Sequence, residues 1–302
     1  MKNIKLKQAL IITAILIFII LFLFGIYYIF LKPSTTQISK DSSKNLIVLF
    51  SLDGLGSNLL GENTPYLNSV MNNSQSSYTL DMQTVNQSET MPSHMSMLTG
   101  LNQEHHGFTL NAVDINTLSL KFKTLFDYSL ENGYSYDSFV TKDKLLYFQA
   151  GKTGSNVIFK DGLSSDVKLD IEKLVKANSS KLFVFIHLRD VDTIGHAKGW
   201  GSTDQLNALK ILDGNLKEIV ESINTKFSSY SREYIFTADH GGEGTTHSSG
   251  CANCRRIPLI IESENVKSKY VLNSSAYNIY DVACIVLNMM DSKEVLGLDC
   301  KR

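Results

Sequence analysis

Carboxylate and imidazole side chains gather in three short stretches of this chain, each beside a glycine and each after an apolar run. They are Asp53, Asp192, His196, Asp239, His240 and His247. Any one stretch alone would suit a turn or a solvated surface, but solvated surfaces rarely need histidine. Carboxylate and imidazole without thiolate suit zinc, manganese or iron better than calcium or magnesium. Six such ligands are enough for two divalent ions.

A candidate nucleophile lies in SETMPSHMSMLTG, where Thr90 precedes Pro92 and an apolar, helix-like run. One interpretation is an ordinary helix N-cap, because threonine caps well and proline suits the first turn. The other interpretation keeps that geometry, since free N–H groups at a helix N-terminus can bind phosphate oxygens. A bound metal could then lower the pKa of the hydroxyl enough to form an alkoxide at neutral pH. We therefore expect Thr90 to be catalytic.

The apolar runs that precede these residues predict a central sheet. Three runs rich in β-branched and aromatic residues lack polar alternation, as in strands covered on both faces; they are Asn45–Leu52, Lys181–Leu188 and Glu233–Ala238. Apolar residues recur at helical spacing in Leu118–Asn132, Asp166–Ala177 and Thr203–Phe227. This order predicts an α/β three-layer sandwich with a mostly parallel sheet, in which ligands bind beyond the carboxyl ends of the strands.

The N-terminal segment predicts a membrane anchor. Residues 9–31 carry no charge and are long enough to cross a bilayer as a helix. A cleaved signal peptide is the alternative, but this run exceeds a usual signal core and lacks a small-x-small cleavage site. The N-terminal amine and Asp41 favour the N-terminus inside. We expect a single-pass membrane protein with a cytoplasmic tail, a signal anchor, a linker and one extracytoplasmic catalytic domain, at residues 1–8, 9–31, 32–44 and 45–302.

Composition excludes little else. With 302 residues and a net charge of -1, the chain can bury a substantial core, and nothing favours a nucleic-acid partner.

Cys251 and Cys254 form a CxxC pair without a second pair, so a disulfide or two free thiols is favoured over a zinc site. Cys284 lies in an apolar helical stretch and suits a buried small hydrophobe. His94 falls one turn after Thr90 and could support it, whereas structural or solvent roles suit His105, His106 and His187 equally well.

Taken in order, these residues resemble the type I phosphodiesterase and nucleotide pyrophosphatase branch of the alkaline phosphatase superfamily. The matching stretches are LDG at Asp53, TMPSH at Thr90, LTGL at Leu98 to Leu101, DTIGH at Asp192 to His196 and ADHGG at Ala238 to Gly242. They run through nearly the whole domain, although the domain is short for the branch and MPSH replaces the more usual FPNH. The resemblance therefore indicates the family and does not specify a nucleotide substrate.

The resemblance implies a role for each residue. One zinc would be surrounded by Asp53, Thr90, Asp239 and His240. The other would be held by Asp192, His196 and His247. Asn111, in HHGFTLN, would contact a phosphate oxygen. Thr90 would attack phosphorus to give a covalent phospho-threonine intermediate, which water then hydrolyses.

The implied activity is hydrolysis of phosphodiester or pyrophosphate bonds in a small-molecule or lipid-linked substrate. A phosphomonoesterase or a phosphoethanolamine-type transferase shares the metal core, and no residue excludes a lipid-linked substrate for an anchored enzyme. A sulfatase is disfavoured because Thr90 cannot become formylglycine and His94 stands where that family requires arginine. A non-catalytic ectodomain is disfavoured because the ligand set is complete.

Overall fold

The computed structural model describes residues 13, 15–22, 24, 43–113, 120–149, 156–174, 179–247, 251–264, 272, 276–292 and 298–300. The chain divides into two units, residues 1–39 and 40–302, and each is taken by itself. In the first unit, residues 15–22 are helical. No helix among the described residues is long and apolar enough to cross a membrane, but most of the anchor predicted at residues 9–31 lies outside them. The anchor and the domain boundaries therefore stay predictions.

A seven-stranded sheet of described residues forms the centre of the second unit, in the order β2-β7-β6-β1-β5-β3-β4. Its strands are β1 (Asn45–Leu52), β2 (Ser76–Gln83), β3 (Ser135–Val140), β4 (Asn156–Phe159), β5 (Lys181–Leu188), β6 (Ser231–Thr237) and β7 (Arg256–Ser263). Strand β7 is antiparallel to both of its neighbours, and the other adjacent pairs are parallel. The expected mostly parallel sheet is confirmed.

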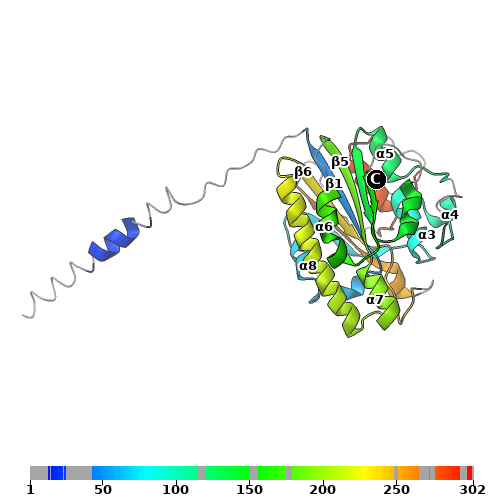
Figure 1. Cartoon of the computed structure of the whole chain (residues 1–302), viewed down its shortest axis with the longest axis horizontal. Helices are drawn as coiled ribbons and strands as arrows, with labels where there is room; N and C mark the ends of the chain where they lie inside the picture. Colours follow the sequence, from blue (N-terminus) through cyan, green and yellow to red (C-terminus); the bar gives the residue numbers. More distant parts are fainter. Residues whose placement is uncertain are drawn as a thin grey trace, which may run out of the picture. The chain divides into compact units, whose positions relative to one another are not determined.

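Helices cover both faces of this sheet, which gives the expected three layers (Figure 1). The described helices are α2 (Pro65–Met71), α3 (Thr90–Thr99), α4 (Gln103–His106), α5 (Leu125–Glu131), α6 (Ser164–Leu174), α7 (Asp190–Lys198), α8 (Thr203–Lys226), α9 (Ala252–Arg255) and α10 (Asp281–Met289). Helices α2, α6 and α7 contact α8, whereas α3 and α5 contact α10. In Figure 1, α6 and α8 lie in front of the strands.

The central strands form where the sequence predicts them because their side chains fill both layers. Every residue of β1 after Asn45 is buried, and so is every residue of β5 after Lys181. Phe50 stacks on Phe236 of the neighbouring strand, with ring centroids 5.0 Å apart. These apolar runs show no alternation because neither face of the strands meets water.

One predicted helix begins later than its apolar pattern indicates. Periodicity placed a helix at Leu118–Asn132, but α5 begins at Leu125. A capping box fixes this start, because the Thr124 N–H donates to Asp127 Oδ2 at 2.7 Å and the Thr124 side chain accepts from the backbone of Asp127. The other predicted helices agree to within a few residues with α6 and α8.

Two disulfides join the four cysteines, Cys251 to Cys254 and Cys284 to Cys300. Of the two alternatives that the sequence left open for Cys251 and Cys254, a disulfide or two free thiols, the structure shows the disulfide. Cys284 is fully buried, as predicted, and it is also bonded to Cys300, a pairing that the sequence left open. The second disulfide holds the segment that contains Asp299, whose N–H donates to the Gly100 carbonyl beyond α3.

Candidate metal centre and active site

Three adjacent parallel strands end level with one another and bring the predicted ligands together. Ser51 of β1 pairs in register with His187 of β5 and with Thr237 of β6. The residues that follow these strands therefore emerge at one edge of the sheet. Asp53 follows β1, Asp192 lies in the first turn of α7 just after β5, and Asp239 follows β6.

Backbone contacts lock these strand ends in place. The Asp192 N–H donates to the Asp53 carbonyl at 3.1 Å, and the Gly54 N–H donates to Asp239 Oδ1 at 3.2 Å. Gly54 has a φ of +81°, and a Cβ there would come within 2.8 Å of the Asp192 backbone. Only glycine allows so close an approach.

We call Asp53, Asp239 and His240 the inner group; one ligand atom from each lies within 4.8 Å of the others. His240 Nε2 is 3.5 Å from Asp53 Oδ1 and 3.5 Å from Asp239 Oδ2. All three side chains are fully buried. The inner group is therefore a compact set of two carboxylates and an imidazole shielded from water.

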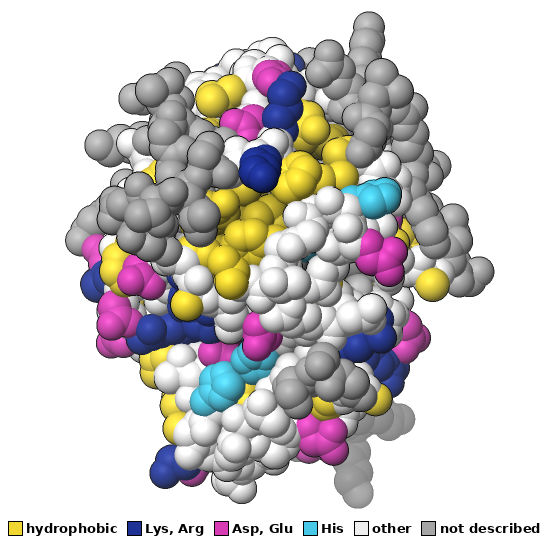
Figure 2. Space-filling model, turned by 90° about the vertical axis from the view of Figure 1, so that its right-hand side faces the viewer, with side chains coloured by type: hydrophobic (Ala, Val, Ile, Leu, Met, Phe, Trp, Pro, Cys, Tyr) yellow, Lys and Arg dark blue, Asp and Glu magenta, His cyan; other side chains and the backbone are white. Residues whose placement is uncertain are grey.

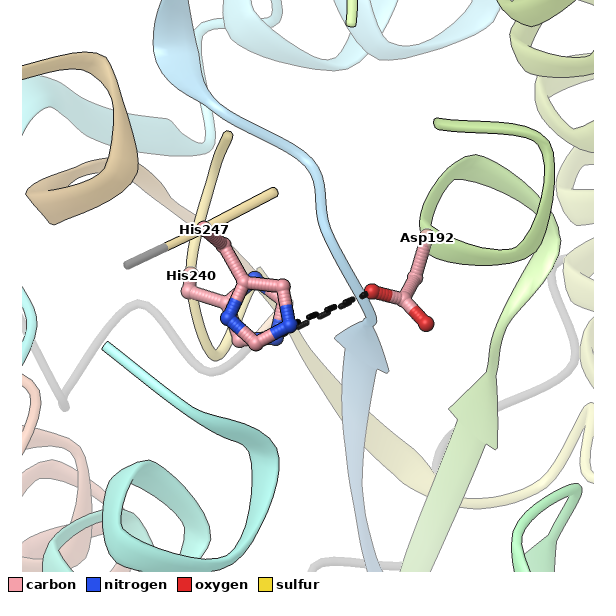
Figure 3. Close-up of side chains that lie close together, drawn as sticks. All are labelled: Asp192, His240 and His247. Carbon is pink, nitrogen blue, oxygen red and sulfur yellow. Dashed lines mark ion pairs between the residues drawn. The ribbon is translucent and has the colours of Figure 1, made fainter. Parts of the chain in front are cut away.

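We call Asp192, His196 and His247 the outer group. Asp192 Oδ1 lies 3.3 Å from His196 Nε2 and 3.9 Å from His247 Nε2. His240 also reaches this group, with its Nε2 4.0 Å from Asp192 Oδ1. Figure 3 shows the overlapping rings of His240 and His247 pointing towards Asp192, and their centroids are 3.8 Å apart. His240 thus stands between the two groups.

The outer group is open to solvent on one side. The His196 side chain is 46% exposed, whereas that of His247 is 10% exposed. Figure 2 shows histidine side chains at the surface beside acidic side chains. Small ions and substrates can therefore approach the centre from this side.

Hydrogen bonds orient the three histidines so that each keeps Nε2 free. Their Nδ1 atoms lie 2.6 to 2.9 Å from backbone carbonyl oxygens, those of Thr245 for His196, Gly241 for His240 and Ser88 for His247. A carbonyl can only accept, so each Nδ1 carries the proton in the neutral ring. The Nε2 lone pairs are thus available to a metal, which is the usual tautomer of a histidine ligand.

Unsatisfied atoms in the site test whether a metal fits. Among the described residues, four buried atoms of the site have no hydrogen-bond partner: Asp53 Oδ1, Asp192 Oδ1, Asp239 Oδ2 and His240 Nε2. Buried carboxylate oxygens without partners are costly, and here they face one another. A divalent cation would satisfy all four, so the donor set fits metal ions.

The carboxylates perturb one another strongly. Burial, together with the charge of Asp53, raises the pKa of Asp239 to about 7. Burial alone would also raise the pKa of Asp53, but the Lys142 ammonium and a hydrogen bond from His187 hold it well below its ordinary value. Without a cation, the two inner carboxylates therefore do not ionise equally.

Thr90 is the first residue of α3, and its hydroxyl faces this centre. Glu89, rather than Thr90, occupies the N-cap position, so the ordinary-cap interpretation of Thr90 does not describe its geometry. Thr90 is buried, and its Oγ1 accepts from Lys142 Nζ at 3.3 Å. His94 donates from Nδ1 to the Thr90 carbonyl at 2.7 Å, so it supports the helix backbone rather than the hydroxyl.

Lys142 is a site residue that the sequence reasoning missed. Its Nζ lies 2.6 Å from Asp53 Oδ2 and 2.8 Å from Asp192 Oδ2, and so bridges the inner and outer groups. Burial alone would lower the pKa of Lys142, but Asp53, Asp192 and Asp239 raise it above its ordinary value. A lysine in a polar turn carries no motif. Only its position just after β3, beside β5, could have indicated it.

Asn111 and Lys144 form a second polar contact next to Thr90. Asn111 Oδ1 accepts from the Met91 N–H at 3.2 Å and from Lys144 Nζ at 3.0 Å. Burial and the charge of Lys142 lower the pKa of Lys144. The structure thus places Asn111 at the N-terminus of α3, where an amide, a backbone N–H and two ammonium groups gather.

His187 contacts Asp53, a role that the sequence did not predict. The Thr141 N–H donates to its Nδ1 at 3.4 Å, so Nε2 carries the proton and donates to Asp53 Oδ2 at 2.9 Å. The two other histidines left aside in the sequence analysis lie elsewhere. His105 pairs with Asp299, and His106 contacts Ser96.

Two family models match parts of this chain. Residues 47–124 match the family model described as type I phosphodiesterase / nucleotide pyrophosphatase. Residues 149–293 match the model described as metalloenzyme superfamily. Together the two matches include every predicted ligand.

Curated relatives are named GPI ethanolamine phosphate transferase 1. The protein from Homo sapiens is 25% identical over 259 residues, which cover 73% of this chain and 26% of that protein. The protein from Neurospora crassa is 28% identical over 207 residues, covering 59% and 20%. The chain thus spans about a fifth to a quarter of the length of these relatives.

Solved structures share the fold. A murine ectonucleotide pyrophosphatase / phosphodiesterase 5 gives a TM-score of 0.66 at 12% identity, covering 85% of this chain and 98% of that one. The C-terminal periplasmic domain of phosphoethanolamine transferase EptC from Campylobacter jejuni gives 0.60 at 14% identity, covering 87% and 97%. The Escherichia coli EptC domain in complex with zinc gives 0.63 at 12% identity, covering 83% of each chain.

Proposed function

We propose that this chain, which belongs to the alkaline phosphatase superfamily, transfers a phosphoester group of the phosphoethanolamine type from a lipid-linked diester to an alcohol, with Thr90 as nucleophile. The match to the type I phosphodiesterase / nucleotide pyrophosphatase model and the likeness to ethanolamine phosphate transferases support an enzyme core that acts on phosphoester bonds. The observation that carries the proposal is the buried Thr90 hydroxyl at the N-terminus of α3, 3.3 Å from the ammonium that bridges Asp53 and Asp192. This hydroxyl lies beside both ligand groups.

Two divalent ions, zinc by preference, fit the donor set. We assign one ion to the inner group and one to the outer group. When bound, the ions would neutralise the carboxylates, lower the pKa of the attacking hydroxyl and polarise the phosphoryl group. The unsatisfied oxygens of Asp53, Asp192 and Asp239 support this assignment.

The residues around Thr90 suit a phosphoryl group. Positive charge comes from Lys142 and Lys144, and neutral donors come from the Asn111 amide and the Met91 N–H. These groups can hold the non-bridging oxygens and compensate the negative charge that spreads over them in the transition state. Lys142 contacts the nucleophile, and we assign it to an oxygen of the transferred group.

In the first half-reaction, Thr90 Oγ1 forms a bond to phosphorus while the bond to the leaving alcohol breaks. The alcohol departs with the proton that Thr90 loses. In the second half-reaction, the hydroxyl of an acceptor attacks the same phosphorus, the bond to Thr90 breaks, and Thr90 regains a proton. If water is the acceptor, the product is a free phosphomonoester.

The relatives decide whether an alcohol or water is proposed as the acceptor of the transferred group. GPI ethanolamine phosphate transferases and two EptC domains favour transfer. Hydrolysis of a phosphodiester or pyrophosphate is the second candidate, and the phosphodiesterase match over residues 47–124 favours it. An N-terminal anchor, if residues 9–31 form one, would keep the site near a lipid substrate.

The full chain in lipid nanodiscs can decide between these candidates. Phosphatidylethanolamine labelled in its headgroup is supplied with zinc and with soluble alcohols, including methyl glycosides. We expect labelled phosphoethanolamine on an alcohol, in excess over the free compound, and no product from the Thr90→Ala variant. Free phosphoethanolamine alone would indicate hydrolysis. Failure to cleave any phosphodiester or pyrophosphate would contradict both candidates.

A further inference from the structure

Trp200 lies in the turn between α7 and α8 and contacts all three segments that carry the predicted ligands. Its ring N–H donates from Nε1 to the Gly54 carbonyl at 3.0 Å, in the turn after β1. Its backbone N–H donates to the Gly244 carbonyl at 2.6 Å, in the loop beyond β6. The third segment is α7, against which the indole packs at Gly195. One half-buried residue thus joins the three segments.

The indole fills the space between α7 and the loop beyond β6. A Cβ at Gly242 would lie 2.2 Å from the ring atoms Cδ2 and Cε2, and a Cβ at Gly195 would lie 2.8 Å from the same atoms. Gly195 directly precedes His196 on α7, and Gly242 follows His240 in the loop. Close-packed interiors do not absorb overlaps of this size without movement. The ring therefore sets the distance between the helix and the loop.

The same ring contacts both imidazoles of the outer group. Its centroid lies 5.1 Å from that of His196 with the planes 86° apart, and 6.0 Å from that of His247 with the planes 70° apart. Edge-to-face packing of this kind is favourable between aromatic rings. The His196 side chain is largely exposed, so contact with a fixed ring restricts the orientations open to it.

We propose that Trp200 is a positioning residue for the outer group. By spacing α7 from the loop beyond β6, it holds His196 and His247 where both can bind the same ion. Partners that orient a ligand in this way typically change metal affinity by about 10- to 100-fold. The proposal rests on the assignment of one ion to each group under the proposed function, and not on the choice between transfer and hydrolysis.

The inner group should depend far less on this ring. Its Asp53 is oriented by His187 and Lys142, in contacts that do not involve the indole. Trp200 reaches this side through its hydrogen bond to the Gly54 carbonyl, which a phenylalanine would lose while keeping a ring. The two ions should therefore respond differently to changes at position 200.

Competition between the zinc-loaded full chain and a chelator gives the affinities of the tighter and of the weaker ion separately. We expect Trp200→Leu to weaken binding of the weaker ion by about 10- to 100-fold and to leave the tighter ion within about twofold of the wild type. Trp200→Phe keeps an aromatic ring and should recover most of the lost affinity. The control Tyr128→Leu removes a half-buried ring on α5 that contacts Lys123, and it should bind both ions normally.

A second variant tests the spacing itself. Gly242→Ala adds a methyl group where the indole lies, so it should also weaken binding of the weaker ion by about tenfold or more. In the Trp200→Leu background, the flexible leucine leaves room for the methyl group, and Gly242→Ala should cost little further affinity. Losses that simply multiply in the double variant would show that the ring does not set the spacing.

The outcomes separate this role from the proposed function. Unchanged affinity for the weaker ion in Trp200→Leu would overturn the proposal, and so would equal losses at both ions, because a general structural role predicts them. A wild-type chain that binds fewer than two zinc ions would overturn the ion assignment and this proposal with it. Neither measurement uses turnover, so a failure of both transfer and hydrolysis would refute the proposed function and leave the role of Trp200 standing.

Discussion

The inner and outer ligand groups are built from similar side chains but lie in different surroundings. Asp53, Asp239 and His240 come directly after strands and are fully buried. Asp192 and His196 come from α7, His247 comes from the loop beyond β6, and His196 is largely exposed. Water can solvate the outer group, whereas the inner carboxylates are enclosed by protein groups, among them His240, His187, Lys142 and the Gly54 N–H. We therefore expect the inner group to hold its ion tightly and the outer group to exchange its ion readily.

Among these changes, Asp239→Asn should have the largest effect on turnover and metal content. The asparagine side chain keeps an oxygen that can accept from the Gly54 N–H, but it lacks the negative charge that an ion in the inner group needs. We expect more than a 100-fold loss of turnover, above the 10- to 100-fold typical of changes to a ligand's supporting partners. Elemental analysis should find one ion fewer per chain. Two ions at full occupancy in this variant would refute the inner assignment.

His187→Leu should have a smaller effect, confined to the inner group. The variant removes the N–H that orients Asp53, and we expect a 10- to 100-fold loss of affinity for the tighter ion. His187→Gln retains a donor at nearly the same place and should recover most of that affinity. Competition with a chelator measures both values. Equal affinity in the leucine variant and the wild type would show that His187 does not position Asp53.

His196→Ala should affect only the weaker ion. Because this ligand is exposed, water can take its place, and we expect about a tenfold loss of turnover at low zinc. Excess zinc should restore the rate, which it should not do for Asp239→Asn. Zinc titration of both variants in parallel makes the comparison. If both recover alike, the two groups do not differ as their burial indicates.

The smallest effect concerns the pH dependence of stability in the metal-free protein. Burial and Asp53 raise the pKa of Asp239 to about 7, so the folded state binds its proton more tightly than the unfolded state. Stability from this residue is therefore lost as pH rises from about 4 to about 7. The Asp239→Asn variant should lack that loss. Between pH 4 and pH 8, its free energy of unfolding should therefore rise relative to that of the wild type by roughly 1 kcal/mol or more. Urea unfolding in chelator at both pH values measures it, and parallel curves for the two proteins would contradict the shift.

Sequence reasoning placed side chains correctly where their position follows from a single strand. Asp53 and Asp239 were found because each ends a buried apolar run, and parallel strands place such ends at one edge. Thr90 was proposed from the residues around it, and the structure places its hydroxyl beside Lys142. These signals are local, so no knowledge of packing was needed to recognise them.

Sequence reasoning failed where a role depends on which elements become neighbours. Lys142 reaches the ligands only because β3 pairs with β5, and for His187 the sequence favoured a structural or solvent role at least as much as a functional one. Periodicity could not show that Thr124 and Asp127 delay the start of α5. The pairing of Cys284 with Cys300 likewise depends on how the C-terminal segment returns to α10, which spacing alone does not encode.

The central claim is that Thr90 carries the transferred group, and trapping tests it most directly. The full chain, loaded with zinc, is mixed with a labelled phosphodiester, quenched in acid within milliseconds and digested for mass spectrometry. We predict up to one equivalent of label on Thr90 before steady turnover begins. Thr90→Ala should carry none, with its metal content unchanged. Label on another residue, or near-normal turnover of Thr90→Ala, would contradict the account.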